Sequence, residues 1–315
     1  MISSACSNLC AEKGFDLFLL NRGTSFRTPP AKAKILIGDI RDKRNVEELI
    51  KNENFDAVVN WIGYSEEHVK TDYELFSGKT KQYIFISSAS AYQKPPAKLP
   101  ITEDVPLFNP YWEYSQKKIE AEKFLTTVFR ERGFPVTICR PSHTYDRTKL
   151  ALYGNYTVLN RMRKNKKIVI HGDGESKWTL TNAKDFARGF IGLLGNQDTV
   201  GEAYHITSDE VLTWNQISKI ISEKMGCGLN AAYLPPEHIV KYDAEWGKSI
   251  LGDKMFDTVF DNSKIRKIVP DFKAEIPYAR GVEEIIEWYS KKENQAVDEK
   301  LDALMDKAIA EYKNN

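Results

Sequence analysis

A serine, a tyrosine and a lysine with complementary chemistry stand close together in this sequence. Ser88 follows the apolar run 83–86, and Tyr114 and Lys118 are four residues apart in a helical stretch, which puts both on one helix face. A free tyrosine is a poor base at neutral pH, but a neighbouring ammonium favours its phenolate form. The three side chains could therefore take the proton of an alcohol and hold its oxygen while hydride leaves the same carbon.

The elements that must position these residues alternate along the chain. The run 83–86, Tyr-Ile-Phe-Ile, predicts a strand buried on both faces. Further strand-like runs cover residues 16–20, 34–38, 57–62 and 135–139, and helical stretches cover residues 1–13, 45–52, 66–77 and 114–132. This alternation predicts an α/β protein with a parallel sheet. Ligands bind at the carboxyl ends of such strands, where Ser88 and Ser90 are expected.

The spacing Tyr-x-x-x-Lys is weak by itself, because Tyr145 and Lys149 share it. That second pair follows Arg140 in a loop, whereas Tyr114 heads a helix downstream of a strand that ends in serines. The alternative for Tyr114 and its lysine is an exposed helix pair without function.

Three segments in this order resemble successive motifs of one family. They are residues 87–92 (Ser-Ser-Ala-Ser-Ala-Tyr), 114–118 and 140–145 (Arg-Pro-Ser-His-Thr-Tyr). They look like motifs of the extended and atypical short-chain dehydrogenase/reductases, the NAD-dependent epimerase/dehydratase group, and the resemblance covers about residues 1–290. It implies a Rossmann-like doubly wound parallel sheet with a smaller C-terminal α/β substrate lobe.

The same resemblance implies roles for individual residues. Tyr114 would be the catalytic base, and Lys118 its activator and a ligand of the cofactor ribose. Ser88 would bind the substrate oxygen, with Ser90 as the reserve candidate for that role. The implied activity is that of an NAD(P)-dependent epimerase, dehydratase or reductase.

Length and charge set the broader expectations. With 315 residues, 42% of them hydrophobic, the chain is long for one domain. We expect a dinucleotide-binding domain over residues 1–150, to which residues 167–207 return, and a substrate lobe with C-terminal helices over residues 151–315. The net charge of +1 gives no reason to expect a polyanionic partner. Without a signal peptide or a long apolar span, we expect a cytoplasmic protein and no membrane partner.

The first strand and the glycine-rich turn of such a fold have no counterpart here. By the resemblance, residues 1–3 match the end of the glycine motif, and Ser3 holds its last small-residue position. We therefore expect a sheet that lacks its central first strand. There are two interpretations. Either the start of the gene is assigned too late, or the protein is truncated and its cofactor site is weakened.

The cofactor is expected to be NAD or NADP. Arg22 follows the second strand and favours NADP, since an arginine can pair with the 2′-phosphate, although a surface turn arginine is the ordinary alternative. By the resemblance, the cofactor-binding candidates are Ser3, Asn21, Arg22, Asp39, Ile40, Trp61, Ile62, Tyr114, Lys118, Pro141 and His143.

The substrate candidates are Ser88, Ser90, Tyr145, Lys177 and Trp178. Relatives that act on nucleotide sugars usually carry an arginine where this chain has Trp178, and Lys177 is the candidate substitute. We expect a small, sugar-like hydroxyl or ketone substrate. Epimerisation, dehydration and reduction all stay open.

RNA and a second copy of the chain are two further candidate partners. A family member that senses dinucleotide or binds RNA without turnover is the alternative function, and the basic run over residues 161–167 is its candidate RNA contact. A solvated helix end is the commoner meaning of such a run. By analogy, the helices at 66–77 and 114–131 are candidate faces for a homodimer. The four cysteines show no metal-ligand spacing.

Overall fold

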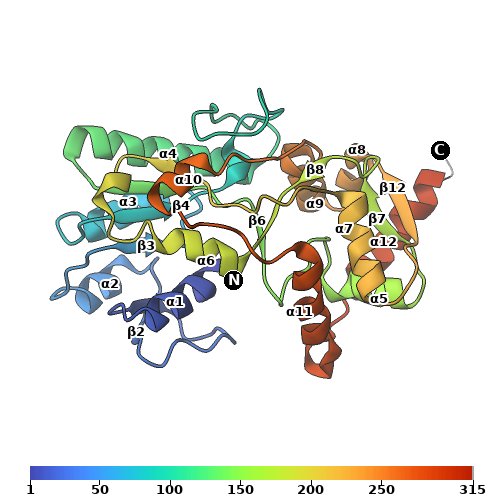
Figure 1. Ribbon diagram of the computed structural model, residues 1–315, viewed down its shortest axis with the longest axis horizontal. Helices are drawn as coiled ribbons and strands as arrows, with labels where there is room; N and C mark the ends of the chain where they lie inside the picture. The colour runs from blue at the N-terminus through green and yellow to red at the C-terminus, as the bar shows by residue number, and fades with distance from the viewer. Residues whose placement is uncertain (314–315) are drawn as a thin grey trace.

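The computed structural model describes residues 1–313 and shows an α/β protein with two lobes side by side (Figure 1). The elements of the first lobe are α1 (Ile2–Glu12), β1 (Phe18–Asn21), β2 (Lys34–Ile37), α2 (Lys43–Leu49), β3 (Val58–Asn60), α3 (Glu66–Phe76), β4 (Tyr83–Ile86), the 3₁₀ turn η1 (Ala89–Ala91), α4 (Glu113–Arg132), β5 (Val136–Cys139), α6 (Ala183–Ile191), η2 (Gln197–Thr199), β10 (Ala203–Tyr204) and α10 (Ser263–Ile268).

The remaining elements join the lobes or build the second one. They are β6 (His143–Tyr145), α5 (Tyr156–Arg163), β7 (Ile168–His171), β8 (Lys177–Trp178), β9 (Leu180–Asn182), β11 (Leu212–Thr213), α7 (Trp214–Lys224), β12 (Ala231–Leu234), α8 (Pro236–Val240), α9 (Ala244–Ser249), the π-helix η3 (Ile250–Lys254), α11 (Tyr278–Ser290), η4 (Lys292–Asn294) and α12 (Glu299–Lys313). Within residues 1–313, no helix has both the length and the apolarity that a membrane crossing requires.

The sheet of the first lobe is parallel and split into two pieces. One piece has the order β10-β5-β4-β3, and the other is the pair β1-β2. Among the described strands, no ladder joins β1 to β3, so the sheet is interrupted at the position where the sequence predicts a missing central strand. The predicted α/β class with a parallel, doubly wound sheet is confirmed.

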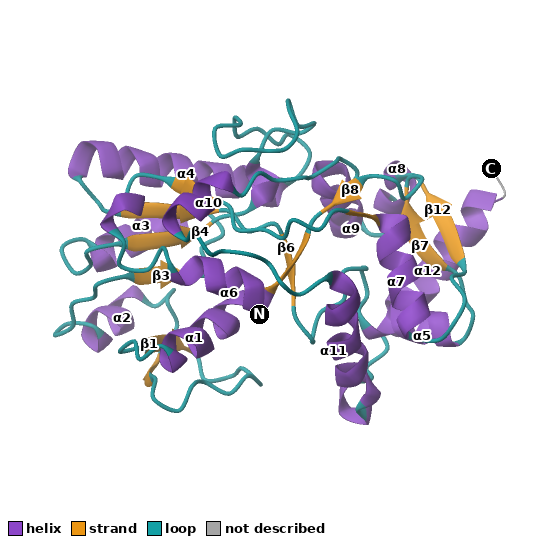
Figure 2. Cartoon of the chain, in the orientation of Figure 1, coloured by secondary structure: helices purple, strands orange, loops and turns teal. Residues whose placement is uncertain are grey.

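The central strand β4 explains how the helices pack. Its side chains alternate between the two faces of the sheet. Tyr83 and Phe85 contact the hydrophobic cluster formed with α2, α3 and α4, whereas Ile84 and Ile86 contact the cluster formed with α1, α6 and α10. All four are buried, as predicted for a strand covered on both sides (Figure 2).

Local sequence signals fix the ends of the helices that frame the site. Helix α4 ends at Gly133, which has a left-handed φ of 68°, and basic residues occupy the last helical turn. Helix α3 starts after Ser65, whose side chain accepts a hydrogen bond from the His68 amide. Helix α7 starts with a capping box formed by Thr213 and Gln216.

The second lobe has its own hydrophobic core and a two-stranded parallel sheet, β7-β12. Because β7 pairs with β12, residues 168–171 lie in this lobe and correct the expectation that the chain returns to the first lobe from residue 167. The elements that lie on the first sheet are α6 and β10. Strands β6 and β9 pair in parallel between the two lobes (Figure 2).

Two residues of the basic run at the end of α5 pair with α12. Arg161 is 1% exposed and pairs with Asp302 at 2.6 Å and with Asp306 at 2.7 Å. Lys166 pairs with the same two aspartates, and Arg163 donates to the Tyr156 hydroxyl of its own helix. The structure therefore uses Arg161 and Lys166 to hold α12 in place, which reduces the open positive charge of this run.

Candidate active site

The structure brings Ser88, Tyr114 and Lys118 together at the carboxyl end of β4 and the start of α4. The Ser88 hydroxyl and the Tyr114 phenol are neighbours, close enough for Ser88 to lower the pKa of the phenol. The Lys118 ammonium lies 5.8 Å from the centre of the Tyr114 ring, one helical turn along α4. A hydroxyl, a phenol and an ammonium thus converge at the strand end where open α/β sheets bind ligands.

Lys118 is held by the backbone at a buried position. Its Nζ donates to the Gly63 carbonyl at 2.6 Å and to the Ile86 carbonyl at 2.7 Å. The side chain is 1% exposed, and burial lowers the pKa of Lys118 to about 7. An ammonium has three N–H groups, so one donor is left for a ligand hydroxyl.

Tyr114 is protonated at neutral pH in the structure without ligands. Burial is the main cause that raises the pKa of Tyr114 to about 12, the nearby Asp253 carboxylate adds to it, and the Ser88 hydrogen bond opposes it. Because the pKa is high, additional positive charge near the phenol is required before Tyr114 can act as a base.

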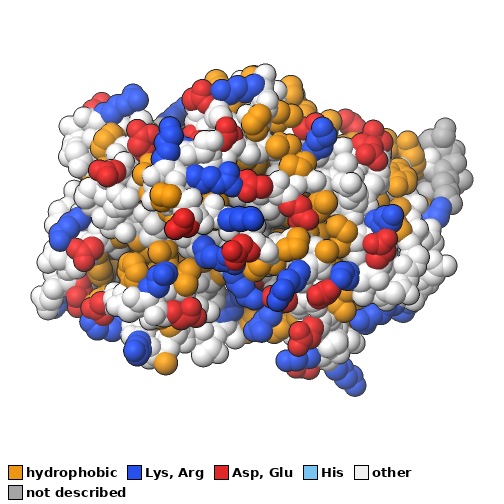
Figure 3. All heavy atoms as spheres, in the orientation of Figure 1, with side chains coloured by type: hydrophobic (Ala, Val, Ile, Leu, Met, Phe, Trp, Pro, Cys, Tyr) orange, Lys and Arg blue, Asp and Glu red, His pale blue; other side chains and the backbone are white. Residues whose placement is uncertain are grey.

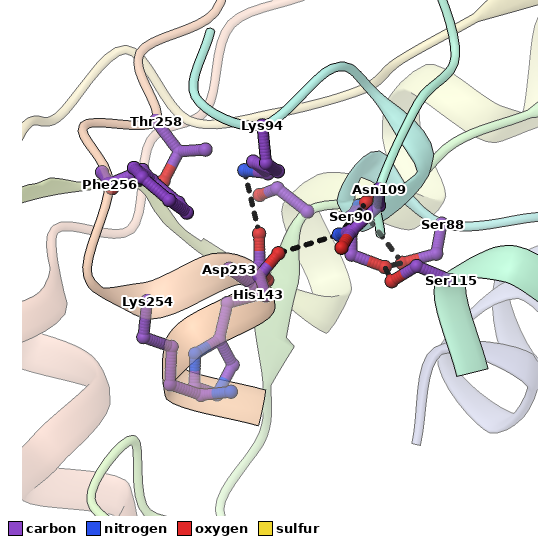
Figure 4. Close-up of polar contacts among 12 residues, drawn as sticks. Ser88, Ser90, Lys94, Asn109, Ser115, His143, Asp253, Lys254, Phe256 and Thr258 are labelled. Atoms are coloured by element: carbon purple, nitrogen blue, oxygen red, sulfur yellow. Dashed lines mark hydrogen bonds and ion pairs between the residues drawn. The ribbon is translucent and has the colours of Figure 1, made fainter. Parts of the chain in front are cut away.

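A row of hydrogen-bonded serine hydroxyls supports Ser88 (Figure 4). Ser88 Oγ lies 2.9 Å from Ser90 Oγ, which accepts a hydrogen bond of 2.8 Å from Ser115 Oγ. Asn109 donates to the Ser90 carbonyl at 2.8 Å and fixes the turn that carries both serines. Ser90 is buried behind Ser88, so Ser88 is the better placed of the two for contact with a substrate oxygen.

A cavity of about 890 Å³ opens beside these residues and reaches into the second lobe. Ser88, Ser90, Trp112, Tyr114, Pro141 and His143 line its inner part, and its wall continues over the second lobe with Tyr153, Trp178, Trp214, Trp246 and Lys254. Mostly aromatic walls with a few polar groups are typical of sites for small organic ligands.

His143 and Trp178 form one wall of the cavity. The Trp178 indole N–H donates to His143 Nδ1 at 3.1 Å, so a neutral imidazole carries its proton on Nε2, where it can donate to a ligand. Burial lowers the pKa of His143 well below its usual range, and Lys254 and Lys149 add to this effect. His143 is therefore neutral at pH 7.

Two predicted substrate residues lie outside this cavity. The Tyr145 ring is buried against Tyr278, and Gly281 of α11 is so close that any larger residue there would collide with the phenol. Lys177 is exposed, and its backbone groups bond to Asp257 and Thr258. Tyr145 belongs to the core because α11 packs over it, and Lys177 points away because neighbouring strand residues face opposite sides.

The predicted cofactor residues lie at the ends of β1, β2 and β3. Asn21 ends β1, Asp39 and Ile40 follow β2, and Trp61 and Ile62 follow β3. Two contacts connect these strand ends. Arg22 lies 3.8 Å from Asp39, and Arg41 donates to the Ile62 carbonyl at 2.5 Å. Ser3 lies in the first turn of α1.

This donor set fits a dinucleotide that spans the strand ends. Asn21, Asp39 and Ile40 offer polar and apolar contacts at one end, and the remaining donor of Lys118 and the cavity residues Pro141 and His143 lie at the other. Arg22 lies 3.8 Å from Asp39 with its side chain 70% exposed, so the arginine stays accessible and this contact does not decide between NAD and NADP.

Sequence reasoning missed several residues around the cavity. Asp253 and Lys254 of the second lobe line it, Lys94 of the first lobe pairs with Asp253, and Trp112 of the first lobe contacts Tyr114 with ring centres 4.8 Å apart. The aromatic and glycine content of residues 235–260 does not identify which side chains face the cavity.

Comparison with known proteins agrees with this architecture. The model of the NAD dependent epimerase/dehydratase family matches residues 1–207, and the chain belongs to this family. It is 25% identical over 250 residues to the chloroplast stem-loop binding protein of 41 kDa b of Arabidopsis thaliana, over 75% of this chain and 62% of that protein. It is 32% identical over 125 residues to the UDP-glucose 4-epimerase of Lactobacillus helveticus, over 35% of this chain and 38% of that enzyme.

Solved structures show the same fold. The UDP-glucose 4-epimerase of Bifidobacterium longum, in complex with NAD⁺ and UDP, superposes with a TM-score of 0.74 at 18% identity and covers 94% of this chain and 97% of that one. The chain spans less than two thirds of the length of both curated relatives, 62% and 38% respectively.

Proposed function

We propose that this protein is an NAD-dependent enzyme that oxidises a secondary alcohol of a sugar-like substrate, with Tyr114 as the proton acceptor. The observation that carries the proposal is the convergence of Ser88, Tyr114 and Lys118 beside one large cavity. Family membership supports an enzyme of the epimerase or dehydratase type.

The chemistry of the chain's own residues follows from their geometry. A bound NAD would supply the hydride acceptor and a second positive charge. The Tyr114 oxygen then takes the proton of the substrate hydroxyl, and the Ser88 hydroxyl donates to the same substrate oxygen. The Lys118 ammonium stabilises the phenolate through its charge, since it lies within one helical turn. Epimerisation would be completed when Tyr114 returns this proton to the ketone oxygen, with the bound cofactor supplying the hydride back to the opposite face of the same carbon.

The cavity supports a nucleotide sugar as the substrate. Its volume of about 890 Å³ is ample for such a molecule, and Trp112, Trp178 and Trp214 offer flat surfaces for a sugar or a base. Among similar proteins, one solved structure is a UDP-glucose 4-epimerase with UDP-glucose, and another is a UDP-glucuronic acid 4-epimerase with UDP-glucuronic acid and NAD.

The first test is cofactor binding followed by turnover. Binding of NADH and NADPH is measured by nicotinamide fluorescence, with this chain and with a version extended by an upstream strand and glycine turn. We expect NADH to bind more tightly than NADPH. Failure of both versions to bind either cofactor would refute the proposal.

The second test is a single substitution. Tyr114→Phe should lower turnover of UDP-glucose or UDP-glucuronic acid by at least about 10²-fold, because it removes the general base, while NADH binding stays unchanged. Tyr111→Phe is the matched control, since Tyr111 is 45% exposed and its ring rests on Phe256. Equal turnover of the Tyr114 variant and the wild type would remove Tyr114 from the mechanism.

A non-catalytic, RNA-binding role is the second candidate, favoured by the similarity to a chloroplast stem-loop binding protein. The ion pairs of Arg161 and Lys166 with α12 weaken it, and the face in Figure 3 mixes acidic and basic side chains without a patch of one sign. Binding of a stem-loop RNA with a steep salt dependence, lost in Arg163→Ala, would favour this role instead.

A further inference from the structure

Several hydrogen bonds fix the backbone of Lys254 at the cavity wall. Lys254 ends a five-residue π-helix, a conformation that is rare and often found at functional sites. Its carbonyl accepts three side-chain hydrogen bonds, from His171 Nε2 at 3.0 Å, Ser176 Oγ at 2.8 Å and Trp214 Nε1 at 3.2 Å. These donors come from three separate segments of the second lobe, so they define the point from which the lysine side chain enters the cavity.

The Lys254 ammonium has no acidic partner. Within residues 1–313, no carboxylate lies within 4.0 Å of its Nζ. Its contacts are a 3.4 Å hydrogen bond to the Ser249 carbonyl and the Trp112 ring, whose centre is 5.4 Å away. Burial lowers the pKa of Lys254 to about 8; the neighbouring Asp253 carboxylate opposes this shift, and Lys149 and Lys94 add to it by smaller amounts. Because Asp253 pairs directly with Lys94, it compensates the charge of Lys254 only in part, and a ligand anion would complete the compensation.

The neighbouring acidic side chain already forms an ion pair with another lysine. Asp253 pairs with Lys94 at 2.8 Å, and the Lys94 side chain is 0% exposed (Figure 4). The other acids that line the cavity, Glu245 and Asp298, are exposed to solvent. Lys149 adds a further positive charge to the lining. The acids that line the cavity therefore do not cancel the positive charge of Lys254, and His143 is neutral.

We propose that Lys254 is a specificity-determining residue whose ammonium binds an anionic group of the substrate, a phosphate or a carboxylate. This inference rests on the proposed function of the cavity as a substrate site. Trp112 lies between Lys254 and Tyr114 and contacts both, so the anion binds one aromatic ring away from the reacting carbon. Trp178 cannot supply the positive charge that binds a substrate anion, so Lys254 supplies it instead.

The test is ligand binding by calorimetry, which needs no turnover. UDP-glucose and UDP-glucuronic acid are titrated into the wild type, Lys254→Met, Lys254→Arg and Lys248→Met. We expect the Met variant at position 254 to bind at least one of these ligands about 30-fold more weakly, because one partner of a buried charge pair is lost. Lys254→Arg should recover much of the affinity, and Lys248→Met, at an exposed position of α9, should bind like the wild type.

The two anions give different results. An equal loss for both ligands identifies a phosphate as the anion, and a loss confined to UDP-glucuronic acid identifies its carboxylate. Wild-type affinity of Lys254→Met for both ligands, or no binding of either ligand to the wild type, would overturn the inference. Binding is measured separately from turnover, so a wild type that binds both ligands through Lys254 but turns over neither would refute the proposed reaction and leave the anion site standing.

Discussion

Replacing Lys118 by methionine should change how stability depends on pH. Burial shifts the pKa of Lys118 from 10.5 to about 7, and at about 1.4 kcal/mol per unit this corresponds to a penalty of about 5 kcal/mol for the charged form in the folded state. Lys118→Met removes that penalty, but it leaves the Gly63 and Ile86 carbonyls without their donor, at about 1–3 kcal/mol each. Near pH 7 the two effects roughly cancel.

The pH dependence separates these effects. Below the folded-state pKa of about 7, Lys118 is charged in both states and the folded wild type carries the full penalty. Above it, the folded state releases its proton while the unfolded state keeps it up to its pKa of about 10.5. Wild-type stability should therefore rise relative to Lys118→Met as pH increases, by about 2–3 kcal/mol between pH 7 and pH 9.

Urea unfolding at several pH values, followed by circular dichroism, measures this difference. Lys117→Met is the matched control, because Lys117 is exposed on the same helix and pairs with Glu113 at 2.7 Å. The control should differ from the wild type by the same small amount at every pH. A stability difference for Lys118→Met that does not change with pH would refute the assignment of a desolvated ammonium.

Three further outcomes follow from the packing. Arg140→Met should destabilise the protein by about 3–5 kcal/mol in urea unfolding, since it leaves the buried Glu122 carboxylate without its 2.7 Å partner, whereas exposed Arg130→Met should have little effect. Gly281→Ala should cost about 1–3 kcal/mol because the new methyl group would meet the Tyr145 ring, and an unchanged melting temperature would contradict this packing. An added upstream strand that fills the break between β1 and β3 should raise the melting temperature, measured by scanning fluorimetry, and a scrambled polar extension should not.

Most of the first lobe could be predicted because its signals are local. The apolar run at 83–86 and its amphipathic neighbours determine strand and helix within a few residues. The short strands β6 and β8 could not be predicted, since their extended form depends on partners distant in the sequence. The pairing of β7 with β12 depends in the same way on a segment about sixty residues further along.

The convergence of Ser88, Tyr114 and Lys118 could also be predicted, because Tyr114 and Lys118 occupy one helix face and Ser88 ends a strand. The side chains that line the rest of the cavity could not. Choosing between Lys177 and Trp178 requires knowing which face of a short strand points inward. The pairing of Lys94 with Asp253 joins residues from different lobes, and only that pairing leaves Lys254 as the uncompensated cation.

The break in the sheet divides the first lobe into parts of unequal cooperativity. The segment α1 to α2 is attached by side-chain packing, chiefly of α1 on α6, and by a few polar contacts, while β3, β4, β5 and β10 share a continuous ladder. Amide hydrogens of β1 and β2 should therefore exchange through a partial opening that leaves β4 and β5 protected. Since the predicted dinucleotide contacts lie on both parts, a bound dinucleotide would bridge them, and its affinity would include the free energy of keeping that opening closed.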